Sequence, residues 1–124
     1  MSAPAEAPQT QLAIDQAILA ELVEIMGPET FGAAFASFVA DLDASRRAMD
    51  VAAATGDLAA IRRNAHRIKG ILSQFGVPGA AAFAHQVETA EETALRDLGE
   101  RLCALLPGAI GEVRRVADML VSRM

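Results

Sequence analysis

A stripe of apolar residues with alternating spacings of three and four runs through the middle of the chain. Its members are Leu58, Ile61, Ala65, Ile68, Leu72 and Phe75. This spacing places them on one face of an amphipathic α-helix, and no strand pattern with a period of two competes. Asp57 stands where an N-cap is expected, and Gly76 stands where glycine commonly ends a helix. The stripe therefore predicts a helix over residues 57–75 with one face toward a core.

Stop signals separate further predicted helices on either side of this one. A short first helix begins with Asp15 as N-cap and ends at Gly27-Pro28, and a long second helix ends near Thr55-Gly56. After the tight connection at residues 77–79, a fourth helix runs to about Ala94. The second helix carries many of the larger core side chains, namely Phe31, Phe35, Phe38, Leu42 and Met49.

The last predicted helix keeps one apolar phase across a proline. The residues in phase are Leu98, Leu102, Leu105, Ala109, Val113, Val116 and Leu120. Pro107 removes one helical hydrogen bond and Gly108 weakens the local helix, so we expect a single kinked helix. Two helices broken at Pro107 are the alternative, with the same core residues. The fold class predicted is all-α: an antiparallel up-down-up-down four-helix bundle with a short extra N-terminal helix.

Length and composition agree with this architecture. The 124 residues suffice for one domain, and a hydrophobic fraction of 52% without tryptophan or tyrosine suits close-packed helices. Residues 1–10, with Pro4 and Pro8 among small residues, indicate a flexible tail, which leaves residues 11–124 for the domain. Because the apolar stripes are used internally, we expect a monomer.

The charge and the single cysteine restrict the class of function. A net charge of -5 disfavours nucleic acid as a partner, because phosphate backbones require a basic surface. Cys103 is the only cysteine and lies in an apolar helical pattern, which indicates a buried, reduced thiol. The chain shows neither a run of about 18 apolar residues nor the features of a signal peptide. We therefore expect a cytoplasmic protein without a membrane segment.

One histidine stands apart on the polar side of the central helix. At about 100° per residue, His66 falls roughly 130° from the centre of the apolar stripe, so it should face solvent. Lys69 and Gly70 follow it by one helical turn, and Ser73 lies on the same flank. A mid-helix glycine costs about 1 kcal/mol relative to alanine. The close approach of another protein's surface is one reason to keep Gly70.

Basic residues gather around this histidine although the chain is acidic. Arg62, Arg63 and Arg67 lie within one turn of His66, and only Asp57 opposes them on this helix. These arginines are either solvated charges or steering charges for an acidic partner; we favour steering for at least one of them.

The run Asn64-Ala65-His66-Arg67-Ile68-Lys69-Gly70, continued by Ser73, Phe75 and Gly76, resembles the signature of histidine-containing phosphotransfer (HPt) domains of two-component phosphorelays. The resemblance extends from about Ile14 to Leu120 and includes the position of Glu88. It implies that His66 is phosphorylated on its imidazole, that Lys69 contacts the phosphoryl oxygens, and that Gly70 admits a receiver domain.

The same resemblance implies the partners. They are response-regulator receiver domains and a histidine kinase or hybrid kinase, between which the phosphoryl group is shuttled. The receiver domain would supply the Mg²⁺, so neither a metal site nor a cofactor is expected in this chain. No autokinase activity is expected, because the chain carries no nucleotide-binding loop.

His85 and Glu88 lie one turn apart on the fourth predicted helix. A carboxylate that accepts from one ring nitrogen of His66 would fix the tautomer and leave the other nitrogen free to attack. Alternatively, Glu88 pairs with a nearby arginine and His85 is a polar flank residue. The pairing of His85 with Glu88 is similar to that in phosphotransfer domains of chemotaxis-type histidine kinases.

Other function classes fit less well. Two histidines and one distant cysteine provide no zinc-ligand spacing, and Ser73 has no evident triad. The serious alternative is an HPt-like binding module that regulates a kinase or receiver without carrying phosphate. The presence of His66, Lys69 and Gly70 together argues against it.

Overall fold

The computed structural model of the chain describes residues 11–124. This range contains five α-helices and no strand: α2 Gln16–Met26, α3 Pro28–Thr55, α4 Leu58–Gln74, α5 Pro78–Glu88 and α6 Glu92–Ser122. The all-α prediction is confirmed for these residues. The tail predicted at residues 1–10 lies outside the described residues.

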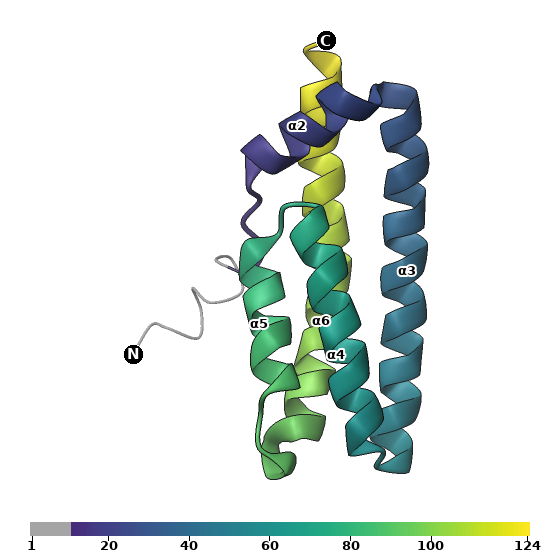
Figure 1. Cartoon of the computed structure of the whole chain (residues 1–124), viewed down its shortest axis with the longest axis vertical. Helices are drawn as coiled ribbons and strands as arrows, with labels where there is room; N and C mark the ends of the chain where they lie inside the picture. Colours follow the sequence, from purple (N-terminus) through teal and green to yellow (C-terminus); the bar gives the residue numbers. More distant parts are fainter. Residues whose placement is uncertain (1–10) are drawn as a thin grey trace.

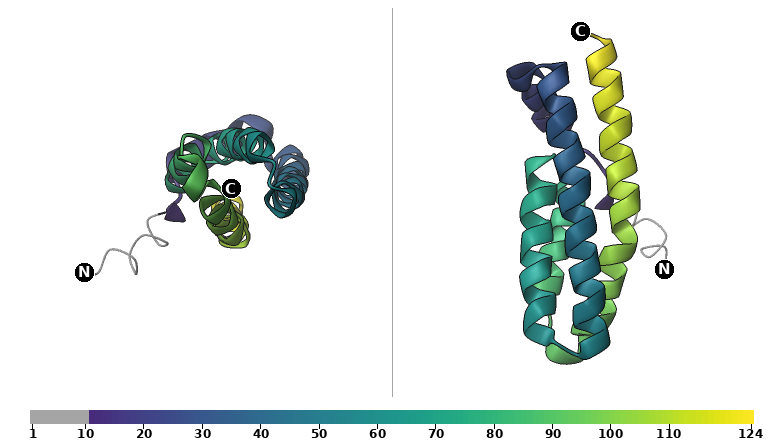
Figure 2. Two further views of the ribbon diagram at one scale, coloured as in Figure 1. Left: turned by 90° about the horizontal axis from the view of Figure 1, so that it is seen from below. Right: turned by 90° about the vertical axis from the view of Figure 1, so that its right-hand side faces the viewer.

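Helices α3 to α6 lie side by side, and α2 crosses one end of them (Figure 1). The chain reverses its direction at each short connection from α3 to α6, as the colours of Figure 1 show. Helix α4 packs against both α3 and α5, and α6 contacts all the other helices (Figure 2). Helix α4 therefore lies between α3 and α5 in the bundle.

Polar caps and glycines set the helix boundaries where the sequence predicts them. Asp15 Oδ1 accepts from the backbone N–H of Ala17, and Asp57 Oδ1 accepts from that of Ala60. The helices α3 and α4 are followed by Gly56 and Gly76, whose φ angles of 71° and 76° favour glycine. The predicted N-caps of α2 and α4 and the predicted ends of α3 and α4 are confirmed.

The apolar face of α4 forms much of the core. Ile61, Ala65, Ile68 and Leu72 are fully buried, and Phe75 is buried just after the helix. Across from them, Phe38 of α3 packs on Phe75 with ring centroids 4.4 Å apart. Because this face is buried, the opposite face of α4 has to point to solvent, as the spacing predicted.

The fourth predicted helix ends earlier than expected. Helix α5 stops at Glu88 rather than near Ala94, and α6 begins at Glu92. After the helix, the N–H of Thr89 donates to the carbonyl of His85, and the N–H of Ala90 donates to the carbonyl of Val87. Leu95, in the first turn of α6, is fully buried.

The last helix is continuous. Pro107 lies inside α6, which extends from Glu92 to Ser122, so the alternative of two helices is wrong. Pro107 is exposed, so its ring does not disturb the core. The predicted stripe is displaced at its margins, where Leu98, Leu105 and Leu120 are half-buried while Leu95, Leu106 and Ala117 are buried. Because α6 contacts four helices, its buried face is broader than one stripe.

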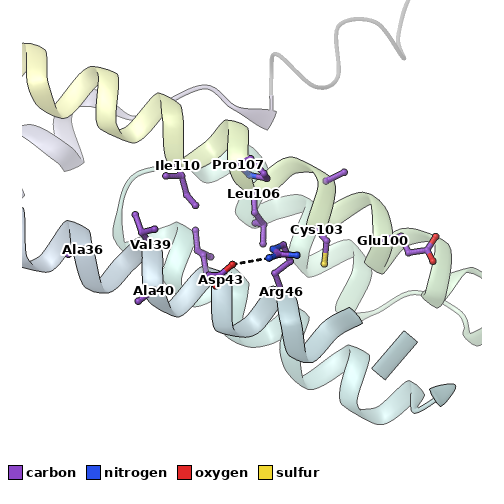
Figure 3. A pocket seen from close by; sticks show the side chains of 12 residues that line it. Ala36, Val39, Ala40, Asp43, Arg46, Glu100, Cys103, Leu106, Pro107 and Ile110 are labelled. Carbon is purple, nitrogen blue, oxygen red and sulfur yellow. Dashed lines mark hydrogen bonds and ion pairs between the residues drawn. The ribbon is translucent and has the colours of Figure 1, made fainter. Parts of the chain in front are cut away.

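A mostly apolar groove of about 740 Å³ lies between α3 and α6 (Figure 3). Val39, Leu106 and Ile110 line it, and an ion pair between Arg46 and Asp43 stands at its side with a nitrogen–oxygen distance of 2.9 Å. Cys103 also lines the groove; it is a free, buried thiol, as predicted. Burial raises the pKa of this thiol to about 11.

Candidate functional site

The imidazole of His66 is exposed on α4. Its side chain keeps 66% of its surface accessible, because it lies opposite the buried residues Ile61, Ala65 and Ile68 of the same helix. The exposure predicted from the helical period is therefore confirmed. An external group can reach the ring, because α4 presents it at the surface rather than inside the bundle.

Glu88 connects α5 to the polar face of α4 through both carboxylate oxygens. Oε2 lies 2.8 Å from His66 Nδ1, and Oε1 lies 2.9 Å from Lys69 Nζ. Only 25% of the Glu88 side chain is exposed. The expected contact between Glu88 and His66 is present. Within residues 11–124, the second partner of the Glu88 carboxylate is Lys69, and not an arginine as in the alternative interpretation.

The contact between Glu88 and His66 fixes the protonation pattern of the imidazole. An ionised carboxylate only accepts hydrogen bonds, so His66 Nδ1 has to carry the hydrogen. In the neutral ring, the lone pair then belongs to Nε2. Glu88 therefore selects the tautomer in which Nε2 is the nucleophilic atom.

The carboxyl group of Glu88 is held in its ionised form. The hydrogen bond from Lys69 is the main cause that lowers the pKa of Glu88 below its usual range, and the hydrogen bond from His66 adds to it. Partial burial acts in the opposite direction without cancelling these effects. Glu88 thus remains an acceptor at neutral pH.

His85 lies beside this cluster at a longer distance. Its Nδ1 is 3.4 Å from Lys69 Nζ and 3.8 Å from Glu88 Oε1. An ammonium group only donates, so His85 Nδ1 accepts in the contact with Lys69. The structure brings His66, Lys69, His85 and Glu88 together.

Gly70 leaves open space next to this cluster. A Cβ atom built on Gly70 meets no atom within 4 Å in the described structure, apart from the neighbouring backbone of α4. Ser73, one turn further along α4, is exposed. The side chain of Glu88 bonds to His66 and Lys69, so Gly70 and Ser73 belong to the exposed surface beside the cluster and not to its hydrogen bonds.

The three arginines near His66 fall into two groups. Arg63 and Arg67 are exposed, and no hydrogen bond or ion pair of theirs is found in the part of the chain that the structure describes. Arg62 is half-buried instead; its Nη1 donates to the backbone carbonyl oxygens of Glu88 and Ala90, at 2.8 Å each. Arg62 therefore differs from Arg63 and Arg67, because its guanidinium group is engaged within the bundle.

The hydrogen bonds from Arg62 to the end of α5 are absent from the sequence-based prediction. Helical spacing places Arg62 on the flank of α4, but it does not specify which carbonyls lie opposite. The predicted fourth helix continued to about Ala94, and in a continuous helix the carbonyls of Glu88 and Ala90 would be used internally. To predict this contact, the sequence would have had to show that the fourth helix ends at Glu88.

The cluster lies beside a shallow hollow lined by Arg62, Arg63, His66, Arg67 and Glu88. No group of three or more histidine, cysteine or acidic side chains in residues 11–124 is arranged to hold a metal ion. None of the helices in this range has the length and apolar character needed to cross a bilayer.

Comparison with known families assigns the chain. The family model described as Hpt domain matches residues 33–116, which include α4, α5 and the whole cluster around His66. Neither the curated proteins nor the solved structures contain a significant match. Hpt domains are phosphotransfer modules rather than kinases, and they interact with receiver domains and histidine kinases. The chain therefore belongs to the Hpt domain family of two-component phosphorelays.

Proposed function

We propose that this protein shuttles a phosphoryl group through Nε2 of His66, between a histidine kinase or its receiver domain and the aspartate of a response regulator. The observation that carries the proposal is the exposed imidazole whose Nδ1 is bound to Glu88, next to the open surface of Gly70. We further assign residues 11–124 to one Hpt domain with an antiparallel four-helix bundle in α3 to α6.

The chemistry follows from the tautomer. The lone pair of His66 Nε2 forms the P–N bond while the P–O bond of an aspartyl phosphate breaks and the aspartate leaves as a carboxylate. The hydrogen stays on Nδ1, so the ring becomes cationic, and the carboxylate of Glu88 offsets this charge. The reverse steps return the phosphoryl group to an aspartate.

Lys69 has two successive roles in this proposal. In the unphosphorylated chain it donates to Glu88 Oε1 at 2.9 Å. When His66 carries a phosphoryl group, Lys69 provides the nearby positive charge for the phosphoryl oxygens. His85, 3.4 Å from Lys69 Nζ, restricts where this ammonium group lies. We assign Mg²⁺ to the receiver domain and no cofactor to this chain.

The surface around His66 suits an acidic partner. Gly70 leaves room for a receiver domain, and Ser73, Arg63 and Arg67 lie on the exposed surface of the same helix. The two free guanidinium groups would accelerate the encounter with the acidic pocket of a receiver. We propose a monomer in the cytoplasm, consistent with the apolar stripes packed internally and with the free thiol of Cys103.

Phosphate transfer tests the proposal. Incubation with receiver domains that carry radiolabelled aspartyl phosphate should label the wild-type chain, and His66→Gln should remain unlabelled. Incubation with ATP alone should leave both unlabelled. Stable label on His66→Gln would refute the assignment of the site. Tight binding of receivers without any label on the wild type would favour the regulatory binding module instead.

A further inference from the structure

Arg62 joins the end of α5 to α4 through the backbone. It precedes His66 by one helical turn, and its Nη1 lies 2.8 Å from the carbonyl oxygens of both Glu88 and Ala90. In the described structure, these are the hydrogen bonds that tie the backbone of residues 88–90 to another helix. The N–H groups of Thr89 and Ala90 donate to the carbonyls of His85 and Val87, which belong to α5 itself.

The carbonyl of Glu88 is one of those that a helix end leaves without partners, and the carbonyl of Ala90 lies in the connection just after it. The last four carbonyls of an α-helix have no intrahelical N–H, and a cation at this end also interacts favourably with the helix dipole. Arg62 supplies both the donor and the charge. Its planar guanidinium holds two acceptors with less freedom than an ammonium group on a flexible stem.

The hydrogen bond from Arg62 to the Glu88 carbonyl matters for the site because of where Glu88 lies. Glu88 is the last residue of α5, and terminal helical residues fray more readily than interior ones. Yet its carboxylate has to stay 2.8 Å from His66 Nδ1. The backbone carbonyl of Glu88 is held by Arg62 while its side chain contacts His66 and Lys69, and all three of these residues belong to α4.

We propose that Arg62 is a positioning residue, which fixes the C-terminal end of α5 so that Glu88 holds His66 in the tautomer with a free Nε2. The role in phosphotransfer rests on the function proposed above, whereas the effect on the tautomer does not. Loss of Arg62 leaves two carbonyls unpaired and allows Glu88 to move. The imidazole then samples the other tautomer, and the reactive nitrogen is available for a smaller share of the time.

A steering role for Arg62 makes a different prediction. A steering charge acts on the encounter with the partner, so its effect does not depend on whether Glu88 is present. A positioning residue acts through Glu88, so its effect disappears when the carboxylate is removed. A double-mutant cycle separates the two roles.

The experiment uses Arg62→Gln, Glu88→Ala and the double variant, with phosphorylation of His66 by a phosphorylated receiver domain as readout. We expect Arg62→Gln to slow phosphorylation roughly tenfold, less than the roughly 100-fold cost of a catalytic group misplaced by a full ångström. In the Glu88→Ala background, the same substitution should cause no further slowing. Arg63→Ala is the matched control, because it removes an equal charge without a contact to α5, and its effect should be the same in both backgrounds.

Nitrogen-15 NMR of the His66 ring, without any partner, provides the second readout. The wild type should show a protonated Nδ1, and Arg62→Gln should shift the ring signals toward a mixture of tautomers. If Arg62→Gln does not fold, Arg62→Lys takes its place in the same cycle. Slowing by Arg62→Gln that persists undiminished in Glu88→Ala would overturn the proposal, as would an unchanged tautomer. A wild type that is never phosphorylated would instead refute the proposed function and leave the NMR test valid.

Discussion

Glu88 Oε2 lies 2.8 Å from His66 Nδ1, although the two residues are 22 positions apart and belong to different helices. This contact makes the two nitrogens of the exposed ring chemically different. Nδ1 faces the bundle and carries the hydrogen, whereas Nε2 is left with the lone pair. The properties of the site follow from what holds this pair of residues together and from what can approach the ring.

Removal of the carboxylate should slow phosphorylation of His66. Glu88→Ala removes a hydrogen bond with a charged acceptor, which contributes about 1.5–3 kcal/mol, so the rate should fall about 10- to 100-fold. Glu88→Gln should have a smaller effect, because its carbonyl oxygen can still accept from Nδ1. Stopped-flow measurement of transfer from a phosphorylated receiver provides the rates. Wild-type rates for Glu88→Ala would contradict the role of the carboxylate.

Two substitutions of Gly70 should act separately on the stability of the fold and on the rate of phosphoryl transfer. Because a Cβ at Gly70 meets no atom of another helix in residues 11–124, Gly70→Ala should raise the free energy of unfolding by about 0.5–1 kcal/mol. Gly70→Gln should fold equally well but slow transfer, since its side chain occupies the surface that a receiver approaches. Gly111→Gln on α6, where the space is also open, is the control and should transfer normally. Equal transfer rates for Gly70→Gln and Gly111→Gln would remove the proposed role of Gly70.

Removal of Lys69 should raise the pKa of Glu88. The hydrogen bond from Lys69 is the largest cause of the lowered pKa, so Lys69→Met should move it back toward 4.5. In the wild type, this interaction stabilises the fold above the unfolded pKa of Glu88, and the stabilisation is lost as the pH falls through the lower folded value. Carbon-13 NMR titration of the Glu88 carboxyl group measures the change. A pKa that stays in place in Lys69→Met would show that another group holds the carboxylate ionised.

The exposed arginines should act on the encounter with a receiver. Arg63→Ala combined with Arg67→Ala should lower the second-order rate constant of transfer several-fold at low ionic strength, with little effect at high salt, because solvent-exposed charges are screened there. Saturating receiver concentrations should restore the wild-type rate. A defect independent of salt would indicate a direct contact instead of steering.

The sequence predicts the site on α4 better than its surroundings. The helical period alone predicts that His66 is exposed and that Ile68 is buried, because a regular helix fixes the direction of each side chain. The proximity of Glu88 to His66 depends on how α5 packs on α4, and it was expected from the resemblance rather than from spacing. The role of Arg62 depends on where α5 ends. Helix α5 ends at Glu88 and α6 begins at Glu92, and the apolar spacing of the sequence does not mark this break.

Cys103 should react slowly until the protein unfolds. The residue is only 9% exposed, and burial raises the pKa of its thiol from 9.0 to about 11, which lowers the thiolate fraction at pH 8 about 100-fold. A disulfide reagent should therefore modify the native chain far more slowly than it modifies the same chain in denaturant. The native state should also lose stability as the pH rises from 9.0 toward 11, because the unfolded thiol ionises first. Rapid modification in the native state would show that the groove between α3 and α6 opens far enough for the reagent to reach the sulfur.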